Sequence, residues 1–205
     1  MEKKYKIISI ISIIVIICLG VFIGINYKNE IENNEFKQVL KNASDLENVT
    51  DEHYYEMFSG RTVSIKEFKE FAQSNVENTS DEINILKEFR DKTSNQTQKE
   101  YLNLEIDRLE QELLAYDKDI DSVNQYQRYL DGEITANKYR ELGTKINDEN
   151  QRIEKEIGII KDNVIIYIDN HNELKQVIKE LNLDEDFYTN ELGGTSGNGG
   201  IYLTK

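Results

Sequence analysis

The hydrophobic pattern of the first residues differs from that of the rest of the chain. Residues 7–25 read IISIISIIVIICLGVFIGI, and no charged residue occurs between Lys6 and Lys28. A helix needs roughly 20 apolar residues to cross the core of a bilayer, whereas a cleaved signal usually has an apolar region of about 7–15 residues followed by small residues. The pattern therefore predicts a retained transmembrane anchor over residues 7–26.

Two alternatives for this segment stay open, because Cys18 and Gly20 lie within it. A signal peptide could be cleaved near them, or a lipid could be attached to Cys18. The apolar run continues past this point through Phe22, and a bulky Ile17 precedes the cysteine. Both features favour the anchor over cleavage or lipid modification.

The charges that flank the apolar segment predict its orientation. Lys3, Lys4 and Lys6 precede it, and positively charged flanks stay in the cytoplasm. We therefore expect a cytoplasmic N-terminus, residues 1–6, and an extracytoplasmic domain after residue 26, attached to the cell membrane by one pass.

From Leu102 onward, apolar residues recur in alternating steps of four and three. The first run comprises Leu102, Ile106, Leu109, Leu113, Tyr116, Ile120, Val123, Gln127 and Leu130. The second comprises Tyr139, Ile146, Asn150, Ile153, Ile157, Ile160, Val164, Tyr167, His171, Leu174, Ile178 and Leu181. This heptad spacing is typical of helices that bury a narrow stripe against each other. The turn-forming Asp131–Gly132 separates the runs, so the pattern predicts a long antiparallel coiled-coil hairpin over residues 98–182.

The two runs also predict the register of this hairpin. A fold about Gly132 and Glu133 places apolar residues opposite one another: Leu102 and Val164, Ile106 and Ile160, Leu109 and Ile157, and Leu113 and Ile153. It also pairs Gln127 with Tyr139 and Tyr116 with Asn150, where the tyrosines could donate hydrogen bonds. The alternative is one longer helix through Gly132 that pairs with a second copy of the chain.

Before the hairpin, the sequence predicts short helices. A Ser or Thr followed three residues later by Glu is a capping-box signature, and it occurs at Ser44/Glu47, Ser64/Glu67, Thr79/Glu82 and Thr97/Glu100. Residues 27–97 are therefore expected to form helices at about 45–58, 65–77 and 80–93, and the next helix begins near residue 98. The second hairpin helix would outrun its partner beyond Val164 and pack on the Ile83–Phe89 helix, with the hairpin projecting from a bundle. The glycine-rich residues 183–205 are expected to be a flexible tail without a sheet partner.

Composition excludes some classes of partner and chemistry. The chain carries a formal net charge of −14, and nucleic-acid binding needs clustered Lys and Arg, so we expect no nucleic-acid partner. Its only cysteine is Cys18, and it contains no proline. The fold must therefore be stabilised by packing rather than by an intramolecular disulfide, and long uninterrupted helices are favoured.

No residues are assigned to a catalytic, cofactor or metal site. His171 falls in the heptad seam, where a polar residue usually sets register. His53 lies among acidic residues on a helix, without a second set of metal ligands. Asp117–Asp121 resembles a calcium loop only briefly, because Ser122 and Arg128 stand where such a loop needs glycine and glutamate.

These features indicate a protein of interaction or scaffolding at the cell envelope rather than an enzyme. We expect it to contact a protein partner, or a second copy, through the hairpin tip, Leu130–Tyr139, and through exposed tyrosines, since Tyr is enriched in interface cores. The candidate tyrosines are Tyr54, Tyr55, Tyr101, Tyr126, Tyr129 and Tyr139. The first alternative is an extracytoplasmic sensor or ligand-binding bundle that signals through a partner membrane protein. The second is an enzyme acting on envelope polymers, which would need convergent acids in a cleft.

Overall fold

The computed structural model describes residues 27–50, 62–183 and 202–204. The chain forms two units, Met1–Gln38 and Val39–Lys205, and the helical bundle belongs to the second. Residues 27–50 are helical. The other elements are β1 (Thr62–Ser64), α2 (Ile65–Lys92), α3 (Gln96–Leu130), α4 (Ala136–Asn170), α5 (Asn172–Glu180) and β2 (Tyr202–Thr204). The predicted all-helical bundle is thus confirmed, apart from one short pair of strands.

Helix α2 begins where the sequence predicts and continues further. The Ser64 side chain accepts a hydrogen bond from the backbone of Glu67, and the Glu67 side chain accepts one from Ser64, which completes a capping box. The expected break at Thr79 is wrong: α2 runs through it, and Thr79 is buried. The neighbouring Ser80 hydroxyl donates to the Val76 carbonyl within the helix, so polar residues here do not end it.

Two further predicted helix starts are also wrong. Ser44 lies inside the helix of residues 27–50 rather than at the start of a new one, and residues 51–58 lie outside the described part of the chain. Helix α3 is capped by Asn95 instead of Thr97, because the Asn95 side chain accepts from the amides of Thr97 and Gln98 at 3.0 and 3.3 Å. Asn is as good an N-cap as Ser.

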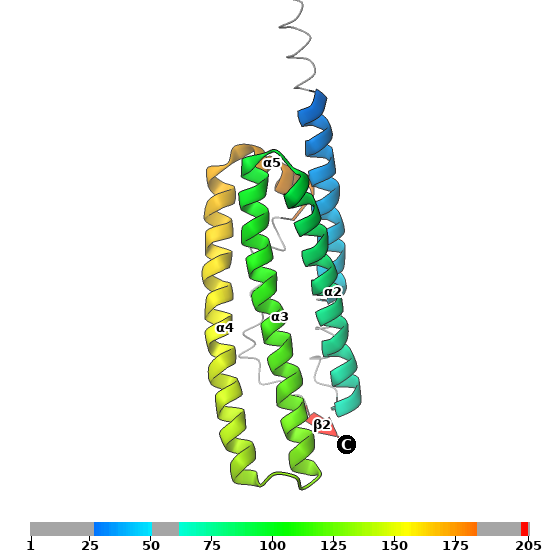
Figure 1. The fold of residues 1–205 in the computed structure, drawn as a ribbon, viewed down its shortest axis with the longest axis vertical. Coiled ribbons are helices and arrows are strands. Elements are labelled where there is room, and N and C mark those ends of the chain that lie inside the picture. The colour runs from blue at the N-terminus through cyan, green and yellow to red at the C-terminus, as the bar shows by residue number, and fades with distance from the viewer. Residues whose placement is uncertain (1–26, 51–61, 184–201, 205) are drawn as a thin grey trace, which may run out of the picture. The chain divides into compact units, whose positions relative to one another are not determined.

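Helix α3 lies between α2 and α4 and packs against both (Figure 1). Residues 131–135 connect α3 to α4, with Gly132 at a positive φ of 75° and Thr135 capping α4. Two polar contacts between α3 and α4, one near the middle of the hairpin and one near its open end, define the antiparallel register. Lys118 of α3 pairs with Glu149 of α4 at 2.6 Å, and the Tyr167 hydroxyl of α4 donates to Glu100 of α3 at 3.0 Å. Both contacts lie within one residue of the predicted register.

The seam between α3 and α4 follows the predicted stripe only in part. Leu102, Ile106 and Leu109 of α3 and Ile153, Ile157 and Val164 of α4 are buried as predicted. The second helix does not continue to Leu181, however. It ends at Asn170, and α5 starts after His171, whose φ and ψ of −125° and 90° are extended. Asn170, His171 and Asn172 are all weak helix formers, which fits a break at this point.

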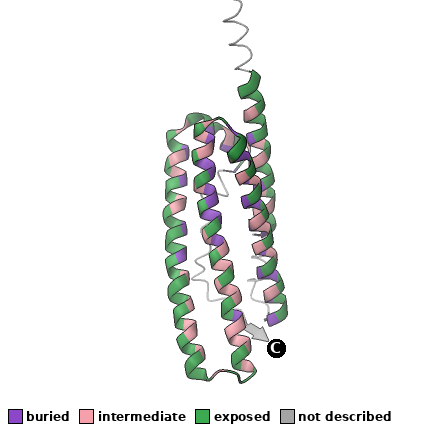
Figure 2. Cartoon of the chain, viewed as in Figure 1, coloured by how far each residue is buried: buried purple, intermediate pink, exposed green. Residues whose placement is uncertain are grey.

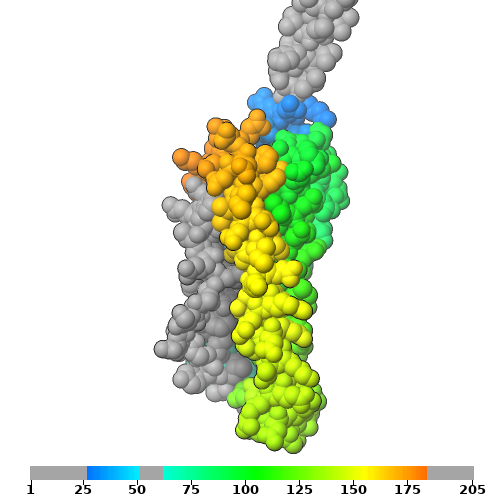
Figure 3. Space-filling model, turned by 90° about the vertical axis from the view of Figure 1, so that its left-hand side faces the viewer, coloured from blue at the N-terminus to red at the C-terminus, as the bar shows by residue number. Residues whose placement is uncertain are grey.

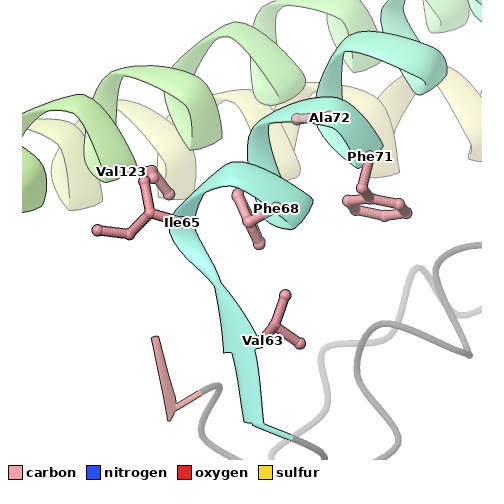
Figure 4. Packing of buried hydrophobic residues seen from close by; sticks show 6 residues of the cluster. All are labelled: Val63, Ile65, Phe68, Phe71, Ala72 and Val123. Atoms are coloured by element: carbon pink, nitrogen blue, oxygen red, sulfur yellow. The ribbon is translucent and has the colours of Figure 1, made fainter. Parts of the chain in front are cut away.

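The sequence predicts that the hairpin projects from the bundle, and this is wrong. At the N-terminal end of α2, a hydrophobic cluster joins β1 and α2 to α3; it comprises Val63, Ile65, Phe68, Phe71, Ala72 and Val123 (Figure 4). Ile120, Tyr126 and Leu130 of α3 pack against this cluster. Helix α2 therefore braces α3 close to the turn, although the buried positions are denser toward the other end of the hairpin (Figure 2).

The two strands were not predicted. β1 pairs in parallel with β2, with Thr62 opposite Tyr202, Val63 opposite Leu203 and Ser64 opposite Thr204. The chain thus does offer a partner strand for residues 202–204, directly before the capping residue of α2. Residues 184–201 of the expected tail lie outside the described part of the chain.

Among residues 27–50, 62–183 and 202–204, no helix is both long enough and apolar enough to cross a membrane. The predicted anchor, residues 7–26, lies outside these ranges.

Candidate functional site

The predicted contact region at the hairpin tip carries three tyrosines from both helices. The ring of Tyr139 on α4 stacks on Tyr129 of α3 with centroids 5.1 Å apart, and it lies 6.0 Å from the ring of Tyr126. Tyr129 is 38% exposed. The expected hydrogen bond between Tyr139 and Gln127 is not formed, and the Gln127 amide nitrogen donates to Asp131 at 2.7 Å. The tip therefore presents a stacked aromatic cluster rather than a polar seam.

Of the other predicted contact tyrosines, only Tyr101 lies in the described part of the chain. Tyr101 is fully buried, so the expectation that it lies on a recognition surface is wrong. Tyr54 and Tyr55 lie outside the described part of the chain, as does His53.

His171 does not set the register of a continuous helix. It lies at the break between α4 and α5, its ring stacks on Tyr167 with centroids 4.1 Å apart, and its Nδ1 lies 2.8 Å from the Tyr167 carbonyl oxygen. The seam position is taken by Ile168, which is completely buried.

The expected hydrogen bond between Tyr116 and Asn150 is not found either. The Asn150 side-chain oxygen has no hydrogen-bond partner among the described residues. Asp117–Asp121 form part of the continuous helix α3 rather than a loop. In the described part of the chain, no three His, Cys, Asp or Glu side chains are placed to hold a metal ion.

An open groove runs between α3 and α4. It has a volume of about 400 Å³ and is lined by side chains of both signs, among them Lys118, Glu149, Arg152 and Glu156. Its apolar lining includes Leu114, which is 45% exposed. Helix α4 lies along the surface of this part of the molecule (Figure 3), and it exposes Ile159 and Ile166 by more than half.

A buried ionic cluster, which sequence reasoning missed, is centred on Arg108 of α3. Its guanidinium binds Glu105 at 2.8 Å and Glu112 at 2.7 Å on the same helix, and it binds Glu47 of the N-terminal helix at 3.1 Å. The side chains of Arg108 and Glu105 are both only 3% exposed. Glu82 of α2 is also buried, at 4%. We refer to Glu47, Glu82, Glu105, Arg108 and Glu112 as the Arg108 cluster.

The cluster holds more acids than Arg108 can neutralise. Burial raises the pKa of Glu105 to about 7 although Arg108 opposes this shift. Burial and the nearby Glu47 carboxylate raise the pKa of Glu82 well above its ordinary range. Burial lowers the pKa of Arg108, but Glu112 and Glu47 outweigh it and hold that pKa above the usual value. The arginine therefore stays charged while two of the carboxyl groups favour the protonated form.

A small cavity lies beside the cluster. It has a volume of about 20 Å³, room for about one water molecule. Its lining comes from residues 39–50, α2, α3 and Leu183, and includes Glu47, Glu82 and Glu105. The second carboxyl oxygen of Glu105, Oε1, has no hydrogen-bond partner among the described residues. Three carboxyl groups, those of Glu47, Glu82 and Glu105, thus border a small, partly open cavity whose other lining is largely apolar.

A signal for the cluster does exist in the sequence. Tyr101, Glu105, Arg108 and Glu112 form a second heptad stripe, one residue before the apolar stripe on α3. Because α3 packs on α2 as well as on α4, this polar stripe is buried too.

Comparison with known proteins does not identify a family: no family model, curated protein or solved structure matches the chain.

Proposed function

We propose that the chain is a single-pass, membrane-anchored extracytoplasmic protein that binds a partner protein, or scaffolds an assembly at the cell envelope, through the tip of the α3–α4 hairpin. The observation that carries this proposal is the cluster of Tyr126, Tyr129 and Tyr139 across that tip, in which Tyr139 stacks on Tyr129. The anchor is residues 7–26, with Lys3, Lys4 and Lys6 on the cytoplasmic side. The coiled-coil character of the hairpin and its extracytoplasmic location belong to the same proposal.

The tip is suited to binding because its shape is fixed before a partner arrives. Leu130 and Tyr126 pack on the hydrophobic cluster that joins α2 to α3, and the turn is closed by the ion pair of Arg128 with Glu133 at 3.2 Å. A preorganised aromatic surface loses little conformational entropy on binding. Tyr is also enriched among the residues that contribute most of the binding energy at interfaces.

Charge favours one kind of partner. The chain carries a net charge of −14, and two cations near the tip are paired with acids, Arg128 with Glu133 and Lys138 with Glu141, while Arg140 donates to the Asn137 side chain. An acidic surface steers encounter with a positively charged one. The proposed partner is therefore a protein with a basic rim around an apolar patch that receives the tyrosines.

In-cell photo-crosslinking tests this proposal. A photoreactive residue replaces Glu133 at the exposed tip of the full chain, and in a second variant it replaces the exposed Asp162 on α4. We expect one specific adduct from position 133 that is absent from position 162. The adduct should disappear with Tyr129→Ala and persist with Leu114→Ala, an exposed apolar residue outside the tip.

Two results would count against a heterologous partner at the tip. Equal capture from positions 133 and 162 would show that the tip has no preference. An adduct of twice the chain mass would show self-association instead.

The alternative function, an extracytoplasmic sensor that signals through a partner membrane protein, is favoured by the Arg108 cluster. This cluster connects Glu47, in the helix that follows the proposed anchor, to the α2–α3 pair. A buried titratable group between two packed elements is a common basis of a conformational switch.

A further inference from the structure

The Arg108 cluster joins residues 39–50 to the bundle through charge, beside the apolar contacts of the same segment. Within residues 39–50, the buried side chains are Leu40, Ala43 and Thr50, and Val39 and Leu46 are half-buried. Glu47 reaches Arg108 from this segment at 3.1 Å while remaining 26% exposed itself. The ionic contact is therefore the part of this docking that can depend on pH.

The groups around this contact do not balance in charge. Glu47 faces Glu82 from α2, and Glu105 and Glu112 from α3. The nearby cations are Arg108 of α3 and Lys161 of α4, and burial lowers the pKa of Lys161. Tyr101 of α3 adds only a neutral hydroxyl, because burial raises its pKa well above the usual value. Four carboxyl groups thus share two cations in a largely buried region, where screening by water is weak.

We propose that the Arg108 cluster is a proton-binding latch: residues 39–50 stay docked on α2 and α3 while Glu82 and Glu105 hold protons, and they are released when these two carboxyl groups ionise. The buried, unpartnered Oε1 of Glu105 beside the small cavity is where the first of these protons is held. Ionisation places up to four negative charges around one guanidinium, and Glu47, the most exposed of them, is the group that can leave.

The titration of Glu105 determines in which direction, and over which pH range, the docking of residues 39–50 changes. Its pKa is about 7 when docked, compared with 4.5 for an exposed glutamate. A carboxyl group whose pKa is raised in the docked form stabilises that form fully when the pH is below the pKa of the exposed group. This stabilisation is lost as the pH rises toward 7. Between about pH 5.5 and about pH 8.5, Glu105 alone would lower the ratio of docked to released segment by at most roughly thirtyfold, the limit reached when release exposes its carboxyl group fully. Glu82 acts in the same direction.

Spin-label distance measurements on the full chain in nanodiscs test the latch. Nitroxide labels replace Asn48 on the docked segment and Asn103 on α3, in a Cys18→Ser background that removes the only native cysteine. The matched control pair is Asn103 on α3 with Asn163 on α4; all three positions are exposed, uncharged asparagines. The measurements are made at about pH 5.5 and about pH 8.5, on either side of the titration.

We expect a single narrow distance for the 48–103 pair at the lower pH and a broad distribution with longer distances at the higher pH. The 103–163 control should stay narrow at both. In the double variant Glu82→Gln and Glu105→Gln, which imitates the protonated side chains, the 48–103 distance should stay narrow at the higher pH.

Each other outcome overturns the latch. A 48–103 distance that does not change with pH shows that the cluster does not control docking. Simultaneous broadening of the control pair shows general loosening of the bundle, and broadening in the Gln variant shows that other groups are responsible. The readout does not involve a partner, so it is independent of the crosslinking test at the hairpin tip.

Discussion

Ile168 and Ile166 lie two residues apart on α4, yet Ile168 is completely buried while Ile166 is 58% exposed. The difference follows from the narrow stripe that an edge helix buries against its neighbour. It provides a matched pair of substitutions, because the same side chain is removed from the same helix in two environments.

We predict that Ile168→Ala lowers the free energy of unfolding by about 2–5 kcal/mol, the usual cost of a cavity at a buried isoleucine. Ile166→Ala should change it by no more than about 0.5 kcal/mol. Urea denaturation followed by circular dichroism measures both. Equal losses in the two variants would contradict the placement of α4.

Ile168 also shows how far the heptad pattern reaches. The spacing predicts Leu102, Leu109 and Ile157 in the seam correctly, because apolar side chains at these steps can be buried only on one face of a helix. It assigns Tyr167 and His171 to the same seam, and the structure buries Ile168 instead. The error begins at Tyr167, before α4 ends at Asn170, because strict heptad steps drift from the 3.6-residue period of a straight helix.

Helix starts were predicted less well than the seam, for a physical reason. A Ser or Thr three residues before Glu is frequent in a chain with 39 acidic residues, and the motif acts as a cap only where the preceding backbone is not helical. Ser64 meets that condition, because it leaves a strand. Thr79 does not, because buried residues on both sides keep α2 continuous.

The Arg108 cluster was missed because its residues look like a solvated face. Glu105, Arg108 and Glu112 alternate in charge at helical spacing, which is typical of exposed ion pairs. Their burial results from the packing of α3 against α2 and against residues 39–50, and this tertiary arrangement cannot be inferred from the heptads of the hairpin alone.

Asp119 of α3 provides a pH-dependent prediction outside the cluster. Burial, followed by the nearby Glu154 carboxylate, raises its pKa from 3.8 to about 6. The folded state therefore binds this proton more tightly than the unfolded state does, and stability is lost as the pH rises from about 4 to about 6. Asp119→Asn should raise the free energy of unfolding by about 1–3 kcal/mol at pH 8.

The same substitution should have little effect at pH 4, where the carboxyl group is largely protonated in the folded protein. Urea denaturation of wild type and variant at several pH values measures the difference. A constant difference at all pH values would contradict the titration of Asp119 in this range.

Two glycines should respond to alanine in opposite directions. Gly132 in the turn has a φ of 75°, which alanine adopts only with strain. Gly158 lies inside α4, where nothing approaches an added methyl group within 4 Å. We predict that Gly132→Ala lowers the free energy of unfolding by roughly 1–2 kcal/mol, whereas Gly158→Ala raises it by about 0.5–1 kcal/mol. Thermal denaturation of both variants measures the signs, and a stabilising Gly132→Ala would contradict the turn geometry.

The buried guanidinium of Arg108 should be far more important for stability than an exposed one. Arg108→Met keeps much of the side-chain volume but removes the charge that faces Glu47, Glu105 and Glu112. Removing one partner of a buried ion pair leaves uncompensated charge and typically costs about 3–5 kcal/mol. The control is Arg128→Met. The Arg128 side chain is 47% exposed, so its replacement should cost no more than about 1 kcal/mol.

Denaturation at pH 8 measures both losses of stability. The loss for Arg108→Met should shrink toward pH 5, because protonation of Glu105 then removes part of the unbalanced charge. A loss that is small, or that does not depend on pH, would show that the carboxyl groups around Arg108 find another partner when the guanidinium is removed.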